Sequence, residues 1–245
     1  FRSALHVVFM ATSPEGVSPV LEFEEEEARI LKITKDLPLV LRVEESGCVE
    51  QLGNMWRRFP RDKFQVFHLT GHASIENKKP CYPYFVTESL TGEPNRIRGE
   101  ELIESFENRL PHLVILSGCA TGERGNGGAL TSMGEALVKK GMPAVLCWGG
   151  SVRDSTATLA AGHVYRRLAE GCSLVEAVGS TFRELRRKKV PDWHLLRLYA
   201  DDEALGQLVQ TPGDHVLDHK PTGMISLDPK NRVHVAAAEE FVGRR

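Results

Sequence analysis

Two apolar segments of this 245-residue chain each end near a side chain that can do covalent chemistry. The first, VFHLTGHAS, carries His72, and the second, LVILSGCATG, carries Cys119. Both segments are rich in β-prone residues and then break into small ones, which predicts a reactive side chain just after each of two buried strands. If these strands are neighbours in one sheet, the imidazole and the thiol can face one cleft. A Cys/His pair of this kind is the minimal apparatus of a cysteine peptidase.

Three features distinguish His72 and Cys119 from an ordinary buried histidine or cysteine. Each follows a predicted strand, and each comes directly after a glycine, which permits a sharp turn and a close approach by a substrate backbone. Their separation also leaves room for a crossover helix between adjacent parallel strands. By contrast, His68 and Cys147 lie inside apolar runs, so we expect both to be structural.

The expected reaction is attack of the Cys119 thiolate on a carbonyl carbon. His72 stabilises the thiolate as a cationic partner and later protonates the leaving amine. The developing oxyanion needs hydrogen-bond donors, and the backbone N–H groups of Cys119 and Ala73 are the predicted ones. No Asp or Asn stands out as an orienting partner for His72, so the sequence predicts a dyad and not a triad.

The elements that must position these residues alternate between strands and helices. The predicted strands are continuously apolar, so neither face of the sheet is expected to be exposed to solvent. We therefore expect an α/β fold with a mostly parallel sheet covered by helices on both faces. Reactive groups in such folds gather at the carboxyl ends of the strands. Strands are predicted over 4–12, 39–43, 64–69, 113–116, 144–148 and 193–199, a hairpin through 84–86 and 90–92, and helices over 22–36, 49–59, 99–110, 130–137, 159–169 and 173–188.

Two charged runs are predicted to be solvated helix faces. The first is the glutamate run Glu24–Glu27, in a helix whose apolar stripe is expected on Leu21, Ala28 and Leu31. The second is the basic run from 183 to 189.

Composition excludes several classes of function. The net charge is −2, with 31 basic and 33 acidic residues, which gives no general reason to bind nucleic acid or a membrane. The five cysteines include no CxxC pair, as expected for reduced thiols in a cytoplasmic protein. No signal peptide and no bilayer-length apolar run is present. The glycine-rich run at 122–128 lacks the Gly-Lys-Ser/Thr ending of a phosphate loop, so we expect no nucleotide site, cofactor or metal.

Several segments together resemble the CHAT family, which comprises caspase-like cysteine peptidases related to separases. They are FHLTGHAS, VILSGCATGERGNGGALTSMGEALVKKGMPAVLCWGGSVRDSTAT, FRELRRKK and WHLLRLYADDEAL, and the resemblance covers about residues 4–205. It implies a caspase-like three-layer sandwich, a catalytic dyad of His72 and Cys119, and a protein substrate. The family usually has Gly directly after the catalytic histidine, whereas this chain has Ala73, which still offers its N–H.

The resemblance also implies a specificity residue. Enzymes of this branch read the residue before the cut with an acidic group after the next strand, and Asp154 resembles that position. A carboxylate at the base of a pocket would select Arg or Lys through a charge-assisted contact. Asp154 also precedes a predicted helix, and capping that helix is the alternative role.

We expect residues 1–210 to form the peptidase domain and 211–245 to be an extension or linker. The stretch Phe241–Arg244 resembles the opening of STAND-type signalling NTPase domains. We therefore expect a longer bacterial protein, acting in defence or regulated proteolysis, whose attached sensor activates the peptidase and promotes oligomerisation.

Two other functions are weighed against the peptidase. One is a catalytically inactive caspase-like scaffold that acts by binding or oligomerising. The other is a small-molecule α/β enzyme or nucleotide-binding module, which the lack of a phosphate loop disfavours. Both dyad positions are filled, and this favours the peptidase.

Overall fold

The computed structural model describes residues 4–18, 23–76, 82–120, 129–150 and 152–209. Within them, one sheet has the strand order β2-β1-β3-β6-β7-β8, and β4 pairs with β3 and β5 with β4. Strands β2, β1, β3, β6 and β7 are parallel, while β8 and the β4–β5 hairpin are antiparallel additions. The strands are β1 (Leu5–Ala11), β2 (Leu39–Glu44), β3 (Val66–Ile75), β4 (Pro83–Glu88), β5 (Pro94–Ile97), β6 (Leu113–Ala120), β7 (Ala144–Trp148) and β8 (Leu196–Ala200).

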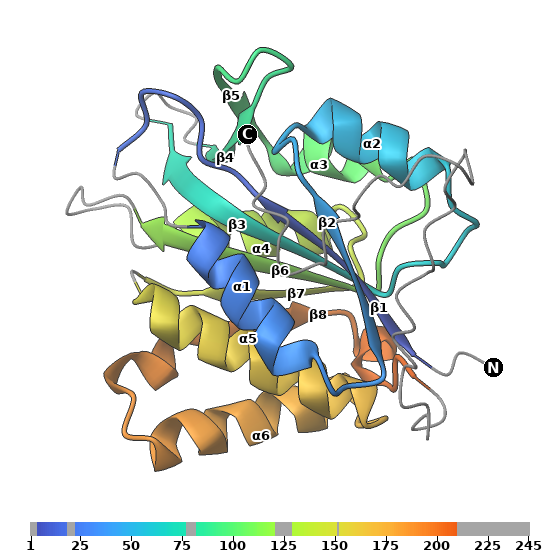
Figure 1. Cartoon of the computed structure of the whole chain (residues 1–245), viewed down its shortest axis with the longest axis vertical. Helices are drawn as coiled ribbons and strands as arrows, with labels where there is room; N and C mark the ends of the chain where they lie inside the picture. The colour runs from blue at the N-terminus through green and yellow to red at the C-terminus, as the bar shows by residue number, and fades with distance from the viewer. Residues whose placement is uncertain (1–3, 19–22, 77–81, 121–128, 151, 210–245) are drawn as a thin grey trace, which may run out of the picture.

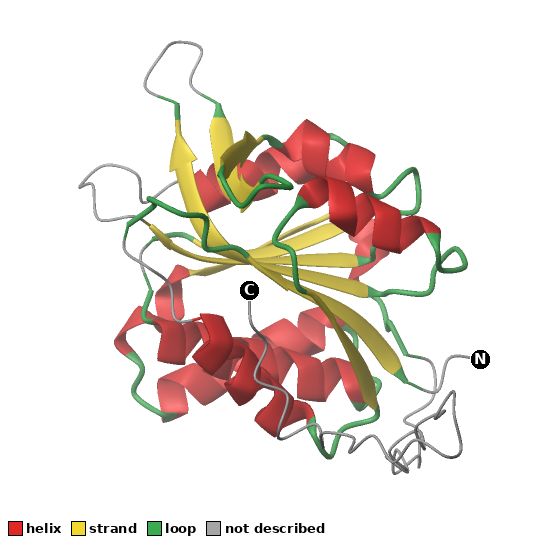
Figure 2. Cartoon of the chain, turned by 45° about the horizontal axis from the view of Figure 1, so that its top comes forward, coloured by secondary structure: helices red, strands yellow, loops and turns green. Residues whose placement is uncertain are grey.

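Helices cover both faces of this sheet and complete a three-layer sandwich, as predicted (Figures 1 and 2). Helices α1 and α5 pack against each other on one face, with α6 outside α5, and α4 lies with α2 and α3 on the other face. None of the described helices is long and apolar enough to cross a membrane. The helices are α1 (Phe23–Thr34), α2 (Val49–Arg57), α3 (Gly99–Ser105), α4 (Ala129–Lys139), α5 (Asp154–Ala169) and α6 (Leu174–Arg187), with short 3₁₀ helices η1 (Pro191–Leu195) and η2 (Asp202–Leu205).

The predicted elements are confirmed, and the differences lie at their ends. Strand β7 has the predicted bounds, but β3 and β6 run on to Ile75 and Ala120. His72 and Cys119 therefore lie within the last residues of their strands and not after them. The return strand of the predicted hairpin is β5, because residues 90–92 form the turn before it. The predicted loop at 122–128 and extension at 211–245 lie outside the described residues.

The buried face of α1 is not the predicted stripe. Ala28 and Leu31 are exposed, whereas Ile30 is fully buried, and Leu21 lies outside the described residues. Glu26, one turn before Ile30, is only 8% exposed. The prediction of a fully solvated glutamate run is therefore wrong at Glu26.

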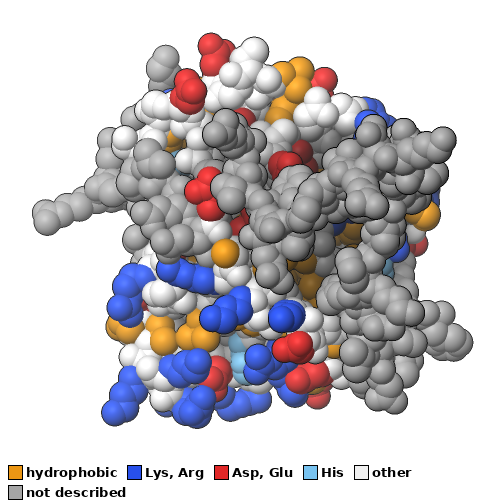
Figure 3. Space-filling model, viewed as in Figure 1, with side chains coloured by type: hydrophobic (Ala, Val, Ile, Leu, Met, Phe, Trp, Pro, Cys, Tyr) orange, Lys and Arg blue, Asp and Glu red, His pale blue; other side chains and the backbone are white. Residues whose placement is uncertain are grey.

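The basic run near the end of α6 is solvated, as predicted. Residues 186–189 are exposed, and lysine and arginine side chains gather over α5 and α6 in Figure 3. Part of this charge is paired within the helix, since Arg187 lies 2.8 Å and Lys188 3.6 Å from Glu184. The run therefore forms an outer surface of the α5–α6 layer.

A buried polar link joins the sheet to α5 below the carboxyl ends of the strands. The Nδ1 atom of His68 in β3 lies 2.6 Å from the Tyr165 hydroxyl of α5, and its Nε2 atom lies 3.0 Å from Oγ of Ser117 in β6. The ring of Phe9 packs edge-on against the imidazole, with 5.2 Å between centroids. His68 and Tyr165 are fully buried. The link ties β3, β6 and α5 together, and it confirms His68 as a structural residue.

This link predicts an acid-sensitive fold. Burial lowers the pKa of His68 to about 3, whereas a histidine in the unfolded chain titrates near 6.5. The stabilisation is fully present above pH 6.5 and is lost as the pH falls toward 3, because only the unfolded chain takes up the proton. We expect this group to lower the free energy of unfolding by up to about 1.4 kcal/mol per pH unit in that range. Urea denaturation from pH 7.5 to 5 should give a shallower pH slope for His68→Gln, and identical slopes would contradict the prediction.

Candidate active site

The backbone register of the two central strands brings His72 and Cys119 together. Strands β3 and β6 are parallel neighbours whose ladder runs from Val66 opposite Leu113 to Ala73 opposite Ala120, and it pairs His72 with Cys119. Neighbouring strands lie about 4.8 Å apart, so the two backbones stand side by side at the carboxyl end of the sheet. The two residues thus come from neighbouring strands, as expected, and their catalytic roles stay predictions.

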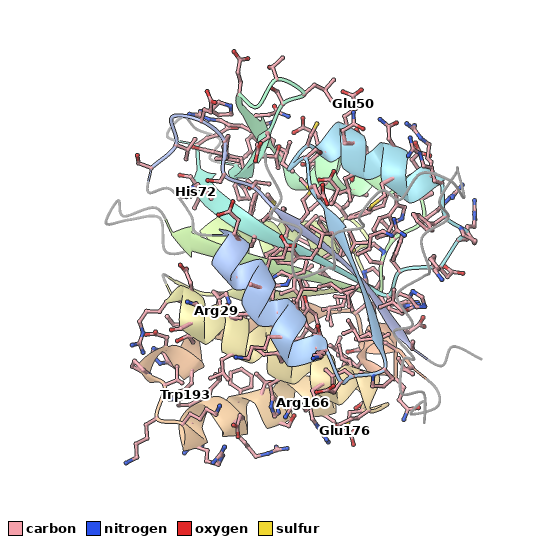
Figure 4. All side chains as sticks on the ribbon, in the orientation of Figure 1. Arg29, Glu50, His72, Arg166, Glu176 and Trp193 are labelled. Atoms are coloured by element: carbon pink, nitrogen blue, oxygen red, sulfur yellow. The ribbon has the colours of Figure 1, made fainter. Side chains whose placement is uncertain are left out.

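His72 lies where β3 exchanges one neighbouring strand for another (Figure 4). Up to Thr70 the neighbour on that side is β1, and from His72 onward it is β4, with His72 opposite Val86. Thr12 bridges the junction, because its backbone N–H donates to the Thr70 carbonyl at 2.9 Å and its hydroxyl to the Val86 carbonyl at 2.9 Å. His72 is only 1% exposed. Strands β4 and β6 therefore flank it on both sides.

Gly71 is required by close packing and not by a turn. A Cβ atom at this position would lie 2.1 Å from Oγ1 of Thr12 and 2.6 Å from the ring of Phe85. Both of those side chains are fully buried, so neither has room to withdraw. The glycine before His72 lets Thr12 and Phe85 pack over the strand, and the sharp turn expected there is absent.

Ala73, the predicted second oxyanion donor, also lies inside β3. It is 1% exposed, and the register places it opposite Phe85 in β4 and Ala120 in β6. The strand therefore continues past the position where the sequence predicts its end. The oxyanion role of the Ala73 and Cys119 N–H groups stays a prediction.

Asp154 is the first residue of α5 and is exposed. The residue at the N-cap is Arg153, whose side chain makes no capping hydrogen bond, so Asp154 does not occupy the capping position of the alternative reading. A carboxylate in the first turn still interacts favourably with the helix dipole. Because α5 begins just after β7, its amino end, where Asp154 stands, lies at the edge of the sheet where β3 and β6 end (Figure 1).

Sequence reasoning missed Glu26. Its Oε2 atom accepts a 2.9 Å hydrogen bond from the hydroxyl of Thr70, which lies two residues before His72 on β3. Burial raises the pKa of Glu26 to about 7, and the negative charge of Asp154 raises it further. The hydrogen bond from Thr70 and the positive charge of Arg29 both lower this pKa, and the effect of Arg29 is the smallest. The available signal was the i, i+4 spacing of Glu26 from Ile30, which puts both on one helix face.

The other cysteines that the structure describes are separate from this site. Cys48 and Cys147 are buried and Cys172 is partly exposed, all as free thiols. Burial raises the pKa of Cys147 to about 12, so it stays a neutral thiol, as predicted for a core residue. Among the described residues, no group of three His, Cys, Asp or Glu side chains is arranged to hold a metal ion.

Comparison with known proteins identifies the scaffold. The model of the family described as "CHAT domain" matches residues 7–225. Similar solved structures include the Drosophila initiator caspase Dronc, with 9% identity, 84% of this chain and 83% of that chain covered and a TM-score of 0.49. Another is pro-sf-caspase-1, with 10% identity, 81% and 91% coverage and a TM-score of 0.50. At these identities the likeness concerns the fold alone, and no curated protein matches. Because the family model spans most of the sequence, the chain belongs to the CHAT domain family and has a caspase-like fold.

Proposed function

We propose that this chain is a cysteine endopeptidase with Cys119 as nucleophile and His72 as general base and acid. The observation that carries the proposal is the register that pairs these two residues at the carboxyl ends of β3 and β6. The caspase-like scaffold of the CHAT family supports the same chemistry.

In the proposed reaction, the Cys119 thiol gives its proton to His72 and the sulfur attacks the scissile carbonyl carbon. The tetrahedral intermediate collapses when His72 gives the proton to the departing amine, which leaves an acyl-enzyme that water hydrolyses. The N–H groups of Cys119 and Ala73 are the proposed donors to the oxyanion. Because His72 is almost fully buried, its electrostatic interaction with a thiolate is stronger than it would be in water.

The proposed substrate is a protein cut after Arg or Lys. Asp154 stands at the amino end of α5, on the edge of the sheet that carries the dyad, and its carboxylate acts on the buried Glu26. A basic side chain that enters beside Asp154 gains a charge-assisted hydrogen bond.

We also propose that an attached sensor or STAND-type NTPase region controls the peptidase and promotes its oligomerisation. The support is the stretch Phe241–Arg244, which lies outside the described residues. Activity is therefore best measured in the full polypeptide that carries this domain.

Removing either dyad residue should abolish cleavage. In the full polypeptide, Cys119→Ala and His72→Ala should each lower kcat/KM on a peptide library by roughly a thousandfold or more, because nucleophile and base act as a unit. The matched controls are Cys172→Ser, at a partly exposed thiol, and His194→Ala, at an exposed imidazole. Both controls should keep the activity. Equal cleavage by the wild type and all four variants would contradict the proposed peptidase activity of this site. No cleavage by any of the five proteins would favour the inactive scaffold.

Replacing Asp154 should change specificity and leave the chemistry intact. Asp154→Asn should lower kcat/KM for substrates with Arg or Lys before the cut by about tenfold or more, because a charge-assisted hydrogen bond is lost. Cleavage of substrates with a neutral residue there should change little. Asp202→Asn makes the same charge change at an exposed site in η2 and is the control. An unchanged preference in Asp154→Asn would remove Asp154 from the pocket.

A further inference from the structure

We propose that Glu26 is a second specificity-determining carboxylate, which binds the basic side chain of the substrate together with Asp154. The inference rests on the proposed peptidase function and adds a residue to its substrate pocket. It begins from a buried carboxyl group that is hydrogen-bonded to Thr70, two residues before His72 on β3.

The position of Glu26 follows from the strand ladder. Thr70 and Ser117 are opposite each other in β3 and β6, each two residues before a dyad residue. Both are buried, and Thr70 donates its hydroxyl hydrogen to Glu26. Two residues along a strand span about 6.6 Å, so the Glu26 carboxyl stands one side-chain layer below His72. This separation is comparable to the length of an extended Lys or Arg side chain.

The Glu26 carboxyl is only partly satisfied by its surroundings. Its Oε2 atom accepts the bond from Thr70, whereas Oε1 is buried and accepts no hydrogen bond from the residues that the structure describes. A buried oxygen without a donor carries a substantial desolvation cost. A guanidinium or ammonium group supplies both the missing N–H donors and the missing positive charge.

The charges around Glu26 favour a cation. Asp154 adds a second carboxylate whose repulsion raises the pKa of Glu26, and the opposing effect of Arg29 is the smallest of the causes. Among the described residues, other titratable groups near Glu26 include Tyr165 on α5, His68, which is hydrogen-bonded to Tyr165, and His72, two residues after Thr70. Burial keeps His68 and Tyr165 neutral, because it lowers the pKa of the histidine and raises that of the tyrosine. A cation placed between Glu26 and Asp154 is attracted by both carboxylates.

The first test measures binding without turnover. In the full polypeptide carrying Cys119→Ala, a peptide with Arg before the cleavage position should bind about tenfold or more tightly than its citrulline analogue at pH 8, by calorimetry. Adding Glu26→Gln should remove most of this preference, because the neutral isostere keeps the shape and loses the charge. The matched control adds Glu24→Gln instead, at an exposed position of the same helix, and should leave the preference for the arginine peptide unchanged.

The second test needs no change at Glu26, so it does not depend on whether a variant folds. The pKa of Glu26 is about 7 in the free protein, and a bound cation lowers it. About three quarters of the Glu26 carboxyls are protonated at pH 6.5, so the arginine peptide should release up to about 0.7 proton on binding, and the citrulline peptide close to none. Calorimetry in two buffers of different ionisation enthalpy measures this number. The preference for arginine should also weaken as the pH falls below 7, where Glu26 is protonated.

The outcomes separate this inference from the proposed function. Cleavage that depends on Cys119 together with an unchanged arginine preference in Glu26→Gln overturns the inference and leaves the peptidase intact. Arginine binding that depends on Glu26, without any cleavage, supports the pocket and overturns the catalytic proposal. Equal binding of the two peptides, or no proton release with the arginine peptide, also overturns the inference.

Discussion

The arrangement of this site depends on the register between β3 and β6. Because side chains alternate along a strand, a slip of one residue would separate His72 from Cys119 and send one of them to the other face of the sheet. The link from His68 to Ser117 and Tyr165 opposes such a slip. In a shifted register the imidazole would stay buried without its partners, which costs more than the bonds contribute when made. A structural histidine four residues before His72 thus holds β3 and β6 in register.

The same face of the sheet also carries a buried carboxyl group that is only partly hydrogen-bonded. Helix α1 buries Glu26 in line with Ile30, where an apolar residue would contribute more to stability. The spacing of Glu26 from Ile30 could have indicated its burial, but its hydrogen bond with Thr70, 44 positions away in the chain, could not be predicted from a local pattern. The placement of His72 and Cys119 on neighbouring strands could be predicted, because each residue follows its own apolar run. Violations of local sequence rules gather at functional sites, and Glu26 is such a violation next to the dyad.

The fold as a whole was accessible from the sequence, and the element ends were not. The exception is strand β7, whose first and last residues could both be predicted, because its apolar run is bounded by a Gly-Met-Pro turn and a glycine pair. Strand β3 runs on to Ile75 because β4 pairs with it there, a contact that no local pattern encodes. Helix α3 ends near residue 105 and not at 110, because Glu107 and Asn108 adopt positive φ angles of 49° and 58°. Glutamate is rarely found in that conformation, so its presence gave no stop signal.

The likeness to pro-sf-caspase-1, with 10% sequence identity, concerns the fold alone and says nothing of a substrate pocket. In the proposed function, specificity comes from the charges that this chain places at the carboxyl edge of its sheet. The Asp154 carboxylate on α5 raises the pKa of Glu26 on α1, and Arg29, which opposes this effect on Glu26, is exposed. An anionic substrate side chain would add a third negative charge to a poorly hydrated site, whereas a cation lowers the electrostatic energy of both acids. The balance of charge at this edge thus supports the proposal of a basic residue before the cut, by an argument separate from the family resemblance.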